Sequence, residues 1–330
     1  MSRDHARKLC AIVLLGTLVA TASAQNTQNP GGQQEDQSLE TLKVDVNVVQ
    51  LFFNVKDKKG GLIPNLTKDD FEIFEDGKPQ TVKYFKAESD LPLTLGILID
   101  ASGSQQRVLE MEKEVGGQFL QEILRTKDEA FVLSFDVNVD LLQDFTNSVS
   151  RLKEALNSAK INMGVGGSIM MPGPIPQGNP RGTLLYDAIY LASHDQLAHE
   201  VGRKAMIILT DGEDQGSQLK IKEAIEASHK ADAIVYVLLI ADRGSWGGYG
   251  EGEMKKLSTE TGGRVIDVGN KYDKLKAAFD QIALELRSQY NIGYTPTNKE
   301  RNGTFRKVEI KTKDKDYKIQ SRSGYYAPKR

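Results

Sequence analysis

LTLGILID, residues 93–100, and KAMIILTD, residues 204–211, decide the fold class of this chain. Each is a short apolar run that ends on an aspartate, which is typical of a strand buried on both faces of a sheet. Between and after these two runs, amphipathic stretches of helical period alternate with further apolar runs such as AIVYVLLIA, residues 233–241. This alternation predicts an α/β domain with a doubly wound, mainly parallel sheet that helices cover on both faces.

The segments on either side of this domain follow a different pattern. Short alternating or β-branched runs such as VDVNVVQLFFNV (44–55) precede the domain, and runs such as FRKVEIKT (305–312) follow it. Neither flank alone contains enough strands for an independently stable sheet. We therefore expect residues 41–91 and 289–330 to form one small antiparallel β-sandwich, into which the α/β domain of residues 92–288 is inserted.

The N-terminus is typical of an exported protein. Residues 1–24 contain a basic start, a short apolar run and an Ala-Ser-Ala site, which together predict a secretory signal peptide. Residues 25–40 are rich in Gln, Asn and Gly and are expected to be a disordered linker. We expect the mature protein to be periplasmic or extracellular, without a transmembrane segment.

Composition excludes several classes of function. Cys10 is the only cysteine, so a mature protein without the signal peptide has no disulfide, thiol nucleophile or Cys-bound zinc. The formal net charge is −2, and the basic residues are spread evenly along the chain. A nucleic-acid partner is therefore not expected.

Oxygen-bearing side chains follow the predicted strands at the edge where a doubly wound sheet binds ligands. Asp100, Ser102 and Ser104 follow the first strand, LTLGILI. Asp211 comes directly after the strand KAMIILT, and Thr183 precedes a helix between them. Carboxylates and hydroxyls are hard ligands that suit Mg²⁺, Mn²⁺ or Ca²⁺ and are poor for soft metals. These residues therefore predict a divalent cation site.

The backbone around the first loop is expected to help this site. Gly103 would let the chain bend tightly between the two serines. The N-terminus of the helix that follows would favour the approach of a negatively charged group.

The pattern Asp100-x-Ser102-x-Ser104, a separate Thr183 and then Asp211 resembles the metal-ion-dependent adhesion site of von Willebrand factor A (VWA) domains and integrin inserted domains. The resemblance implies that the hydroxyls contact the metal directly or through water, while the aspartates hold it directly or through a water shell. It also implies a sixth coordination position that is open to a carboxylate of an acidic partner.

The resemblance to VWA domains covers residues 92–288. The flanks, FEIFEDGKPQTVKYF (71–85) before the domain and YNIGYTP (290–296) after it, resemble a bacterial subfamily of VWFA-related proteins. From this resemblance we also hypothesise that the helix over residues 271–288 transmits changes at the metal site to the sandwich.

Each part of the motif also has an ordinary structural interpretation. The aspartate and serines after the first strand could simply cap a helix, and Thr183 could be the N-cap of the helix that follows it. Asp211 and Gly212 could form a common turn. The conjunction of all three segments at one edge of one sheet favours the metal site.

Two Gly-rich loops are candidates for contacts with the partner. Residues 162–181 form either a lid near the metal or a surface loop, and they contain Met170 and Met171. The loop from Asp242 to Gly252 offers Trp246 and Tyr249, which are aromatic residue types enriched at interfaces. These two aromatic residues could equally fold back onto the domain.

The expected function is an exported, metal-dependent binding module and not an enzyme. A metal-assisted hydrolase is one alternative, but its general base would have to be Glu213 or Asp214, which are expected to be solvated. The other alternative is a structural envelope protein in which the VWA domain is a scaffold. The remaining predicted helices carry His194, His199 and His229, which lack metal-ligand spacing and are expected to be solvated on the surface.

Overall fold

The computed structural model describes residues 48–87, 91–161, 182–240 and 249–329. The predicted signal peptide and linker, residues 1–24 and 25–40, lie outside the described residues. In the part of the chain that is described, no helix is both long and apolar enough to cross a membrane.

The central feature is a six-stranded sheet with the order β10-β9-β8-β5-β6-β7. Five strands are parallel, and β7 pairs with β6 in the antiparallel direction at one edge. The mixed α/β class and the mainly parallel sheet are thus confirmed, while the edge strand β7 was not predicted. The strands are β5 (Leu93–Asp100), β6 (Glu129–Phe135), β7 (Val139–Thr146), β8 (Arg203–Thr210), β9 (Ala233–Leu239) and β10 (Val265–Asp267).

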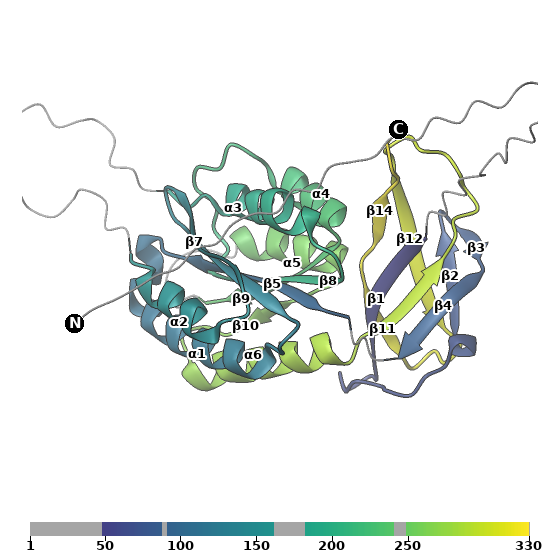
Figure 1. Cartoon of the computed structure of the whole chain (residues 1–330), viewed down its shortest axis with the longest axis horizontal. Coiled ribbons are helices and arrows are strands. Elements are labelled where there is room, and N and C mark those ends of the chain that lie inside the picture. Colours follow the sequence, from purple (N-terminus) through teal and green to yellow (C-terminus); the bar gives the residue numbers. More distant parts are fainter. Residues whose placement is uncertain (1–47, 88–90, 162–181, 241–248, 330) are drawn as a thin grey trace, which may run out of the picture. The chain divides into compact units, whose positions relative to one another are not determined.

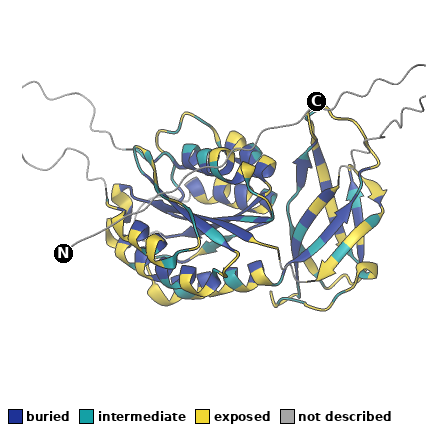
Figure 2. Ribbon diagram, in the orientation of Figure 1, coloured by how far each residue is buried: buried dark blue, intermediate teal, exposed yellow. Residues whose placement is uncertain are grey.

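Helices cover both faces of this sheet (Figure 1). One buried cluster joins the sheet to α1, α2 and α6, and a second joins its other face to α3, α4 and α5. Figure 2 shows the sheet as an almost continuous layer of buried residues between these helices. The α-helices are α1 (Leu109–Ile123), α2 (Val149–Ser158), α3 (Leu185–Leu191), α4 (Ile221–Ala231), α5 (Tyr249–Thr261) and α6 (Tyr272–Arg287). Short 3₁₀ segments span Lys68–Asp70, Gly103–Arg107 and Leu197–His199, and a π-helical turn spans Ala192–Gln196.

The order of the strands places a switch point between β5 and β8. The chain leaves β5 through α1 toward β6 on one side, and it leaves β8 through α4 toward β9 on the other. The two strands are parallel neighbours, with Ile99 opposite Leu209. Loops that follow two such strands diverge and leave a crevice at their carboxyl ends, where α/β proteins bind ligands.

The flanking segments form two four-stranded sheets, ordered β13-β1-β11-β4 and β14-β12-β2-β3. Each sheet contains strands from both the N-terminal and the C-terminal flank. The two sheets share one apolar core, in which Phe53 of one sheet contacts Phe71 of the other with ring centroids 5.1 Å apart. The strands are β1 (Val49–Lys56), β2 (Phe71–Glu75), β3 (Lys78–Gln80), β4 (Val82–Ala87), β11 (Tyr290–Tyr294), β12 (Phe305–Thr312), β13 (Lys318–Ser321) and β14 (Gly324–Tyr326).

The chain leaves the flanking sheets and returns to them at one point. Ala87, the last residue of β4, pairs with Tyr290, the first residue of β11, in an antiparallel ladder. All six strands of the central sheet lie between these two residues in the sequence.

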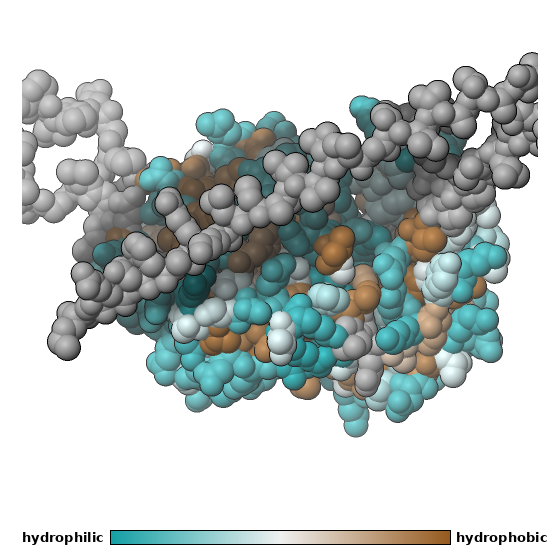
Figure 3. Space-filling model, viewed as in Figure 1, coloured by the Kyte–Doolittle hydropathy of each residue, from teal (hydrophilic) through white to brown (hydrophobic). Residues whose placement is uncertain are grey.

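Hydrophilic side chains dominate the face of the molecule that is visible in Figure 3. The large apolar side chains exposed among the described residues are spread over several elements and loops. They are Val48, Tyr84, Leu91, Leu141, Val201, Tyr272, Leu284 and Phe305.

Candidate metal centre at the switch point

Asp100 ends β5 at the switch point, and its side chain is fully buried. Its carboxylate accepts hydrogen bonds from the backbone N–H of Ser102 (2.9 Å) and from the hydroxyl of Thr210 (2.7 Å). Burial, together with the nearby negative charge of Asp211, raises the pKa of Asp100 to about 7. Among the described residues no basic side chain forms an ion pair with it, so this buried carboxylate lacks a positive counterpart.

The two serines of the first loop lie close together. The hydroxyls of Ser102 and Ser104 are 3.0 Å apart, and the 3₁₀ segment that begins at Gly103 holds the loop in shape. Ser102 is buried and Ser104 is exposed, so the pair reaches from the interior to the surface. The special bend expected at Gly103 is not found, because its φ is not positive and an added Cβ would meet open space.

Thr183 is buried beside the loop that follows β8. Its backbone N–H donates to the carbonyl of Gln215 (3.1 Å), and the N–H of Gln215 donates back to the carbonyl of Thr183 (3.0 Å). Leu184 is the N-cap residue of α3, and no side chain caps this helix. The ordinary interpretation of Thr183 as the N-cap is therefore wrong.

The loop after β8 is attached to the start of α3 by two aspartates. The backbone N–H of Tyr186 donates to Asp214 (3.2 Å), whose carboxylate also accepts from the hydroxyl of Ser217. In the other direction, the carboxylate of Asp187 accepts the backbone N–H groups of Gln218 and Leu219, each at 3.0 Å. These bonds fix the segment of Thr183 against the segment of Asp211. Asp214 was expected to be solvated, but it is half-buried and holds the loop.

Asp211 itself begins this loop and is half-buried. Its carboxylate accepts the backbone N–H of Glu213 at 3.1 Å. Gly212 follows with φ of 86°, a left-handed conformation that favours glycine. An added Cβ at Gly250 in α5 would lie 1.7 Å from the carbonyl oxygen of Gly212, so only glycine permits this close approach. The start of α5 thereby packs directly against the loop.

A further acidic residue near the site was not predicted. Glu112 in α1 is fully buried, and among the described residues nothing donates a hydrogen bond to its Oε2. Burial and then the negative charges of Asp100 and Asp211 raise the pKa of Glu112 well above its usual range. When the amide of Gln105 is oriented to satisfy its neighbours, it donates to Glu112 (3.3 Å) and accepts from the backbone N–H of Asp211 (3.2 Å).

The donor atoms of these residues fit a hard divalent cation. The described residues contain no cluster of three or more His, Cys, Asp or Glu that could hold a metal, so carboxylates alone do not form the site. The donors that gather here are carboxylate and hydroxyl oxygens, which Mg²⁺, Mn²⁺ and Ca²⁺ prefer. The buried acids also lack the positive charge that normally accompanies them. The structure thus brings the five predicted residues to one end of the sheet, and their role as metal ligands remains a prediction.

The predicted partner contacts lie mostly outside the described residues. This applies to Met170, Met171 and Trp246, and with them to the loop of residues 162–181. Tyr249 is the first residue of α5, and its side chain is not described.

The three histidines differ in their surroundings. His194 and His199 are exposed, as expected. The prediction for His229 is wrong, because this side chain is buried and its ring packs against Phe305 (5.2 Å) and Tyr326 (6.4 Å). Burial lowers the pKa of His229 to about 4, so it is neutral at physiological pH.

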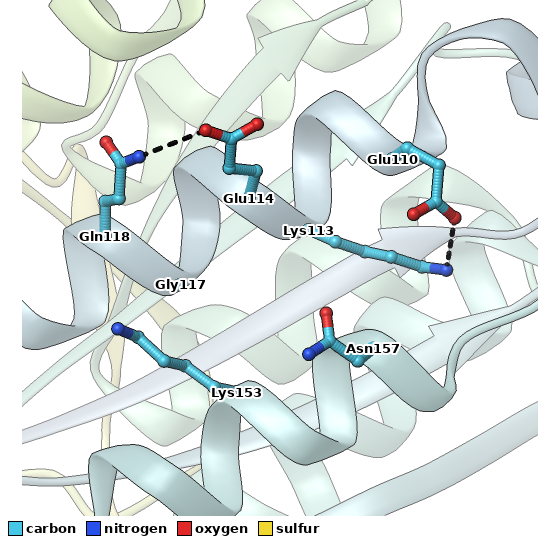
Figure 4. A pocket seen from close by; sticks show the side chains of 7 residues that line it. All are labelled: Glu110, Lys113, Glu114, Gly117, Gln118, Lys153 and Asn157. Atoms are coloured by element: carbon cyan, nitrogen blue, oxygen red, sulfur yellow. Dashed lines mark hydrogen bonds and ion pairs between the residues drawn. The ribbon is translucent and has the colours of Figure 1, made fainter.

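A surface hollow of about 480 Å³ lies between α1 and α2 and contains none of the predicted site residues (Figure 4). Its charges are balanced between acidic and basic side chains. Lys113, for example, forms an ion pair with Glu110 at 2.8 Å. We assign no function to it.

Comparison with known proteins finds similarity only at the level of solved structures. No family model matches the chain, and no curated protein matches it. The conserved hypothetical protein BatB from Bacteroides thetaiotaomicron is 21% identical, with 59% of this chain and 100% of that chain covered and a TM-score of 0.46. A von Willebrand factor type A protein from Catenulispora acidiphila is 13% identical, with 87% and 75% covered and a TM-score of 0.47.

A third similar structure contains a metal. Proximal thread matrix protein 1 from the mussel byssus, in a form with a zinc-occupied MIDAS motif, is 15% identical. The match covers 63% of this chain and 48% of that chain, with a TM-score of 0.47. All three similarities are distant.

Proposed function

We propose that this chain is an exported VWA-domain protein that binds an acidic partner through a divalent cation, Mg²⁺ or else Mn²⁺ or Ca²⁺. The observation that carries the proposal is the fully buried carboxylate of Asp100, which lies beside Asp211 and has no basic partner among the described residues. A buried charge without a counterpart is costly, and a bound cation removes this cost. Without a cation, Asp100 and Asp211 repel each other, and this repulsion stabilises nothing in the fold.

The ion would be held by five side chains, those of Asp100, Ser102, Ser104, Thr183 and Asp211. Bound there, the cation supplies a positive charge that a carboxylate from a partner can approach. The protein keeps its own donors in place through the hydrogen bonds of Asp100 and through the backbone pairing of Thr183 with Gln215. The neutral hydroxyls of the two serines and the threonine leave more of the ion's charge uncompensated than carboxylates in their place would.

The flanks complete the proposed architecture. We take their two antiparallel sheets as a sandwich that carries the inserted VWA domain, residues 92–288. Export through the predicted signal peptide would place the protein in the periplasm or outside the cell. Fractionation of cells that express the full chain tests this part, and retention in the cytoplasm would contradict it.

We propose a binding function and not catalysis. A hydrolase needs a general base close to the reacting water. Asp214, one of the two candidates, is engaged with the start of α3, and Glu213 accepts a hydrogen bond from the side chain of Gln215 (2.9 Å). The alternative of a scaffold whose sandwich binds the partner makes a different prediction, because its binding would survive chelation of the metal.

Calorimetric titration of the full chain with Mn²⁺ tests the proposed function. Wild-type protein is expected to bind one ion, and Asp100→Ala is expected to bind none that can be detected. Glu114→Gln, which removes an exposed charge on α1, is the control and should bind as the wild type does. A pull-down from the envelope fraction with Mg²⁺ and with EDTA then tests the partner. Equal recovery under both conditions would favour the scaffold.

A further inference from the structure

Glu112 is a buried acid that the five-residue metal site does not use. It lies in the buried face of α1, where its neighbours in the helix, Leu109, Val115 and Phe119, are apolar core residues. A glutamate is almost never fully buried unless it is paired. Here its Oε2 has no hydrogen-bond donor among the described residues, so its position has no explanation in the packing of the helix.

The contacts of Glu112 connect it to the metal site. Gln105, itself 1% exposed, lies between the carboxylate of Glu112 and the backbone N–H of Asp211, with distances of 3.3 and 3.2 Å. Asp100 and Asp211 are close enough to Glu112 for their charges to be felt there. Glu112 therefore lies on the interior side of the site, where a partner from solvent cannot reach it.

We propose that Glu112 acts on the cation site from behind Gln105, without contacting the ion, and that it sets the balance between holding the ion and capturing an acidic ligand. This inference rests on the proposed function. A bound cation favours the ionised form of Glu112. The third negative charge near the ion then strengthens the binding of the ion, because opposite charges attract strongly where little water screens them. The same charge reduces the net positive charge of the loaded site, so it weakens the attraction of an incoming carboxylate.

The two effects have opposite signs, which makes the proposal testable with Glu112→Gln. This change keeps the shape of the side chain and removes its charge. We expect the affinity for Mn²⁺, measured by calorimetry on the full chain, to fall about tenfold. We expect the affinity of the Mn²⁺-loaded protein for acetate, measured by water-proton relaxation, to rise about threefold.

Two controls separate this role from a structural one. Glu114→Gln lies two residues away on the exposed side of α1 and should change neither affinity. Metal-free Glu112→Gln should melt at or near the temperature of the wild type, because it replaces a buried carboxyl whose Oε2 accepts no hydrogen bond among the described residues. If this variant does not fold, Glu112→Met, which fills a similar volume with an apolar side chain, replaces it with the same expected changes.

The possible failures are distinguishable. If the wild type binds Mn²⁺, Asp100→Ala abolishes binding and a folded Glu112 variant binds with unchanged affinity, the inference is overturned and the proposed function stands. A decrease of both affinities together would show a structural role only and would also overturn it. If the wild type does not bind Mn²⁺, the proposed function fails and this inference fails with it.

Discussion

Buried acids in different regions of this molecule are compensated in opposite ways. Glu285 in α6 is 1% exposed, and its carboxylate forms ion pairs with Lys56 and Arg264, each at 2.8 Å. Gln320 donates a further hydrogen bond to it at 3.1 Å. Because these partners come from the flanking sheets and from the segment before β10, Glu285 joins elements that are distant in sequence.

Glu75 in the flanking sheets is compensated in the same manner. It accepts hydrogen bonds from the hydroxyls of Tyr294 (2.7 Å) and Tyr325 (2.9 Å) and lies 3.4 Å from Arg306. Burial and the neighbouring carboxylate raise the pKa of Tyr325 to about 12. Both tyrosines therefore remain protonated donors at physiological pH.

Asp100 at the carboxyl end of β5 and Glu112 in α1 lack such basic partners among the described residues. The difference indicates which buried acids maintain the fold and which await a ligand. A paired acid is already stabilised by the protein, so its removal harms the fold. An unpaired acid destabilises the empty protein, so its removal should harm only what binds there.

The largest expected effect is the loss of stability when a paired buried acid is removed. Glu285→Ala leaves Lys56 and Arg264 without their negative partner in a mostly buried position. We expect the free energy of unfolding to fall by about 3–5 kcal/mol, measured by urea denaturation. The control, Glu110→Ala, removes a glutamate whose side chain is 85% exposed. It should change the free energy of unfolding by less than about 0.5 kcal/mol. A loss below about 1 kcal/mol for Glu285→Ala would break the contrast.

In metal-free protein, Asp100→Asn is expected to raise the free energy of unfolding. The folded pKa of Asp100, about 7, is above its ordinary value of 3.8, so the folded state binds a proton more tightly. The stability that this bound proton contributes is fully present below pH 3.8 and is lost as the pH rises through 7. The stability of Asp100→Asn relative to the wild type should therefore rise by about 4 kcal/mol between pH 4 and pH 8. Urea denaturation across this range in EDTA is the measurement, and parallel curves for the two proteins would refute it.

His229 is a buried base whose neighbours are aromatic rings, so it differs from both the paired and the unpaired acids. Its folded pKa, about 4, is below the ordinary 6.5, so its contribution to stability is present above pH 6.5 and is lost as the pH falls toward 4. Between pH 7 and pH 4.5, His229→Leu should lose about 2 kcal/mol less stability than the wild type does. Thermal melts at pH 7 and pH 4.5 compare the two proteins. His199→Leu changes an exposed histidine and should leave the acid sensitivity intact.

The smallest effect concerns the attachment of the metal-site loops. Asp187→Ala removes the acceptor of two backbone N–H groups, so we expect a loss of about 1–2 kcal/mol in stability. Because these bonds hold the loop of Asp211 against the segment of Thr183, the affinity for Mn²⁺ should fall about threefold as well. This is less than the roughly tenfold or greater loss typical of groups that hydrogen-bond a metal ligand, because Asp187 bonds only the backbone of Gln218 and Leu219. Asp187→Asn retains one acceptor oxygen and should recover part of both losses. Unchanged Mn²⁺ affinity in Asp187→Ala would show that the loops are held by other means.

The features that the sequence predicted are those with local signals. Apolar strands that end on aspartate identified β5 and β8, and the spacing of Asp100, Ser102 and Ser104 identified their loop. Alternating runs identified strands in both flanks. The strand β7 was missed because it is an edge strand, with no residue fully buried and Leu141 45% exposed, so its apolar pattern is weak.

The features that were missed depend on packing between distant segments. Glu112 does interrupt an apolar helical face, which is a detectable signal, but its sequence position does not show that it approaches Asp211. His229 is buried because Phe305 and Tyr326, far along the chain, pack against it. Asp214 was expected to be solvated, and the sequence gives no signal for Asp187. Only the tertiary structure shows that each holds the other's segment.

The pairing of Ala87 with Tyr290 has a consequence for how the protein is made. Roughly 200 residues separate these neighbours, so a long loop must close before the ladder between β4 and β11 can form. During synthesis, β1 to β4 leave the ribosome first and must wait for their partners in β11 and β12. The inserted domain has all its strands in one continuous stretch and can fold in the meantime, which would bring the two waiting ends together.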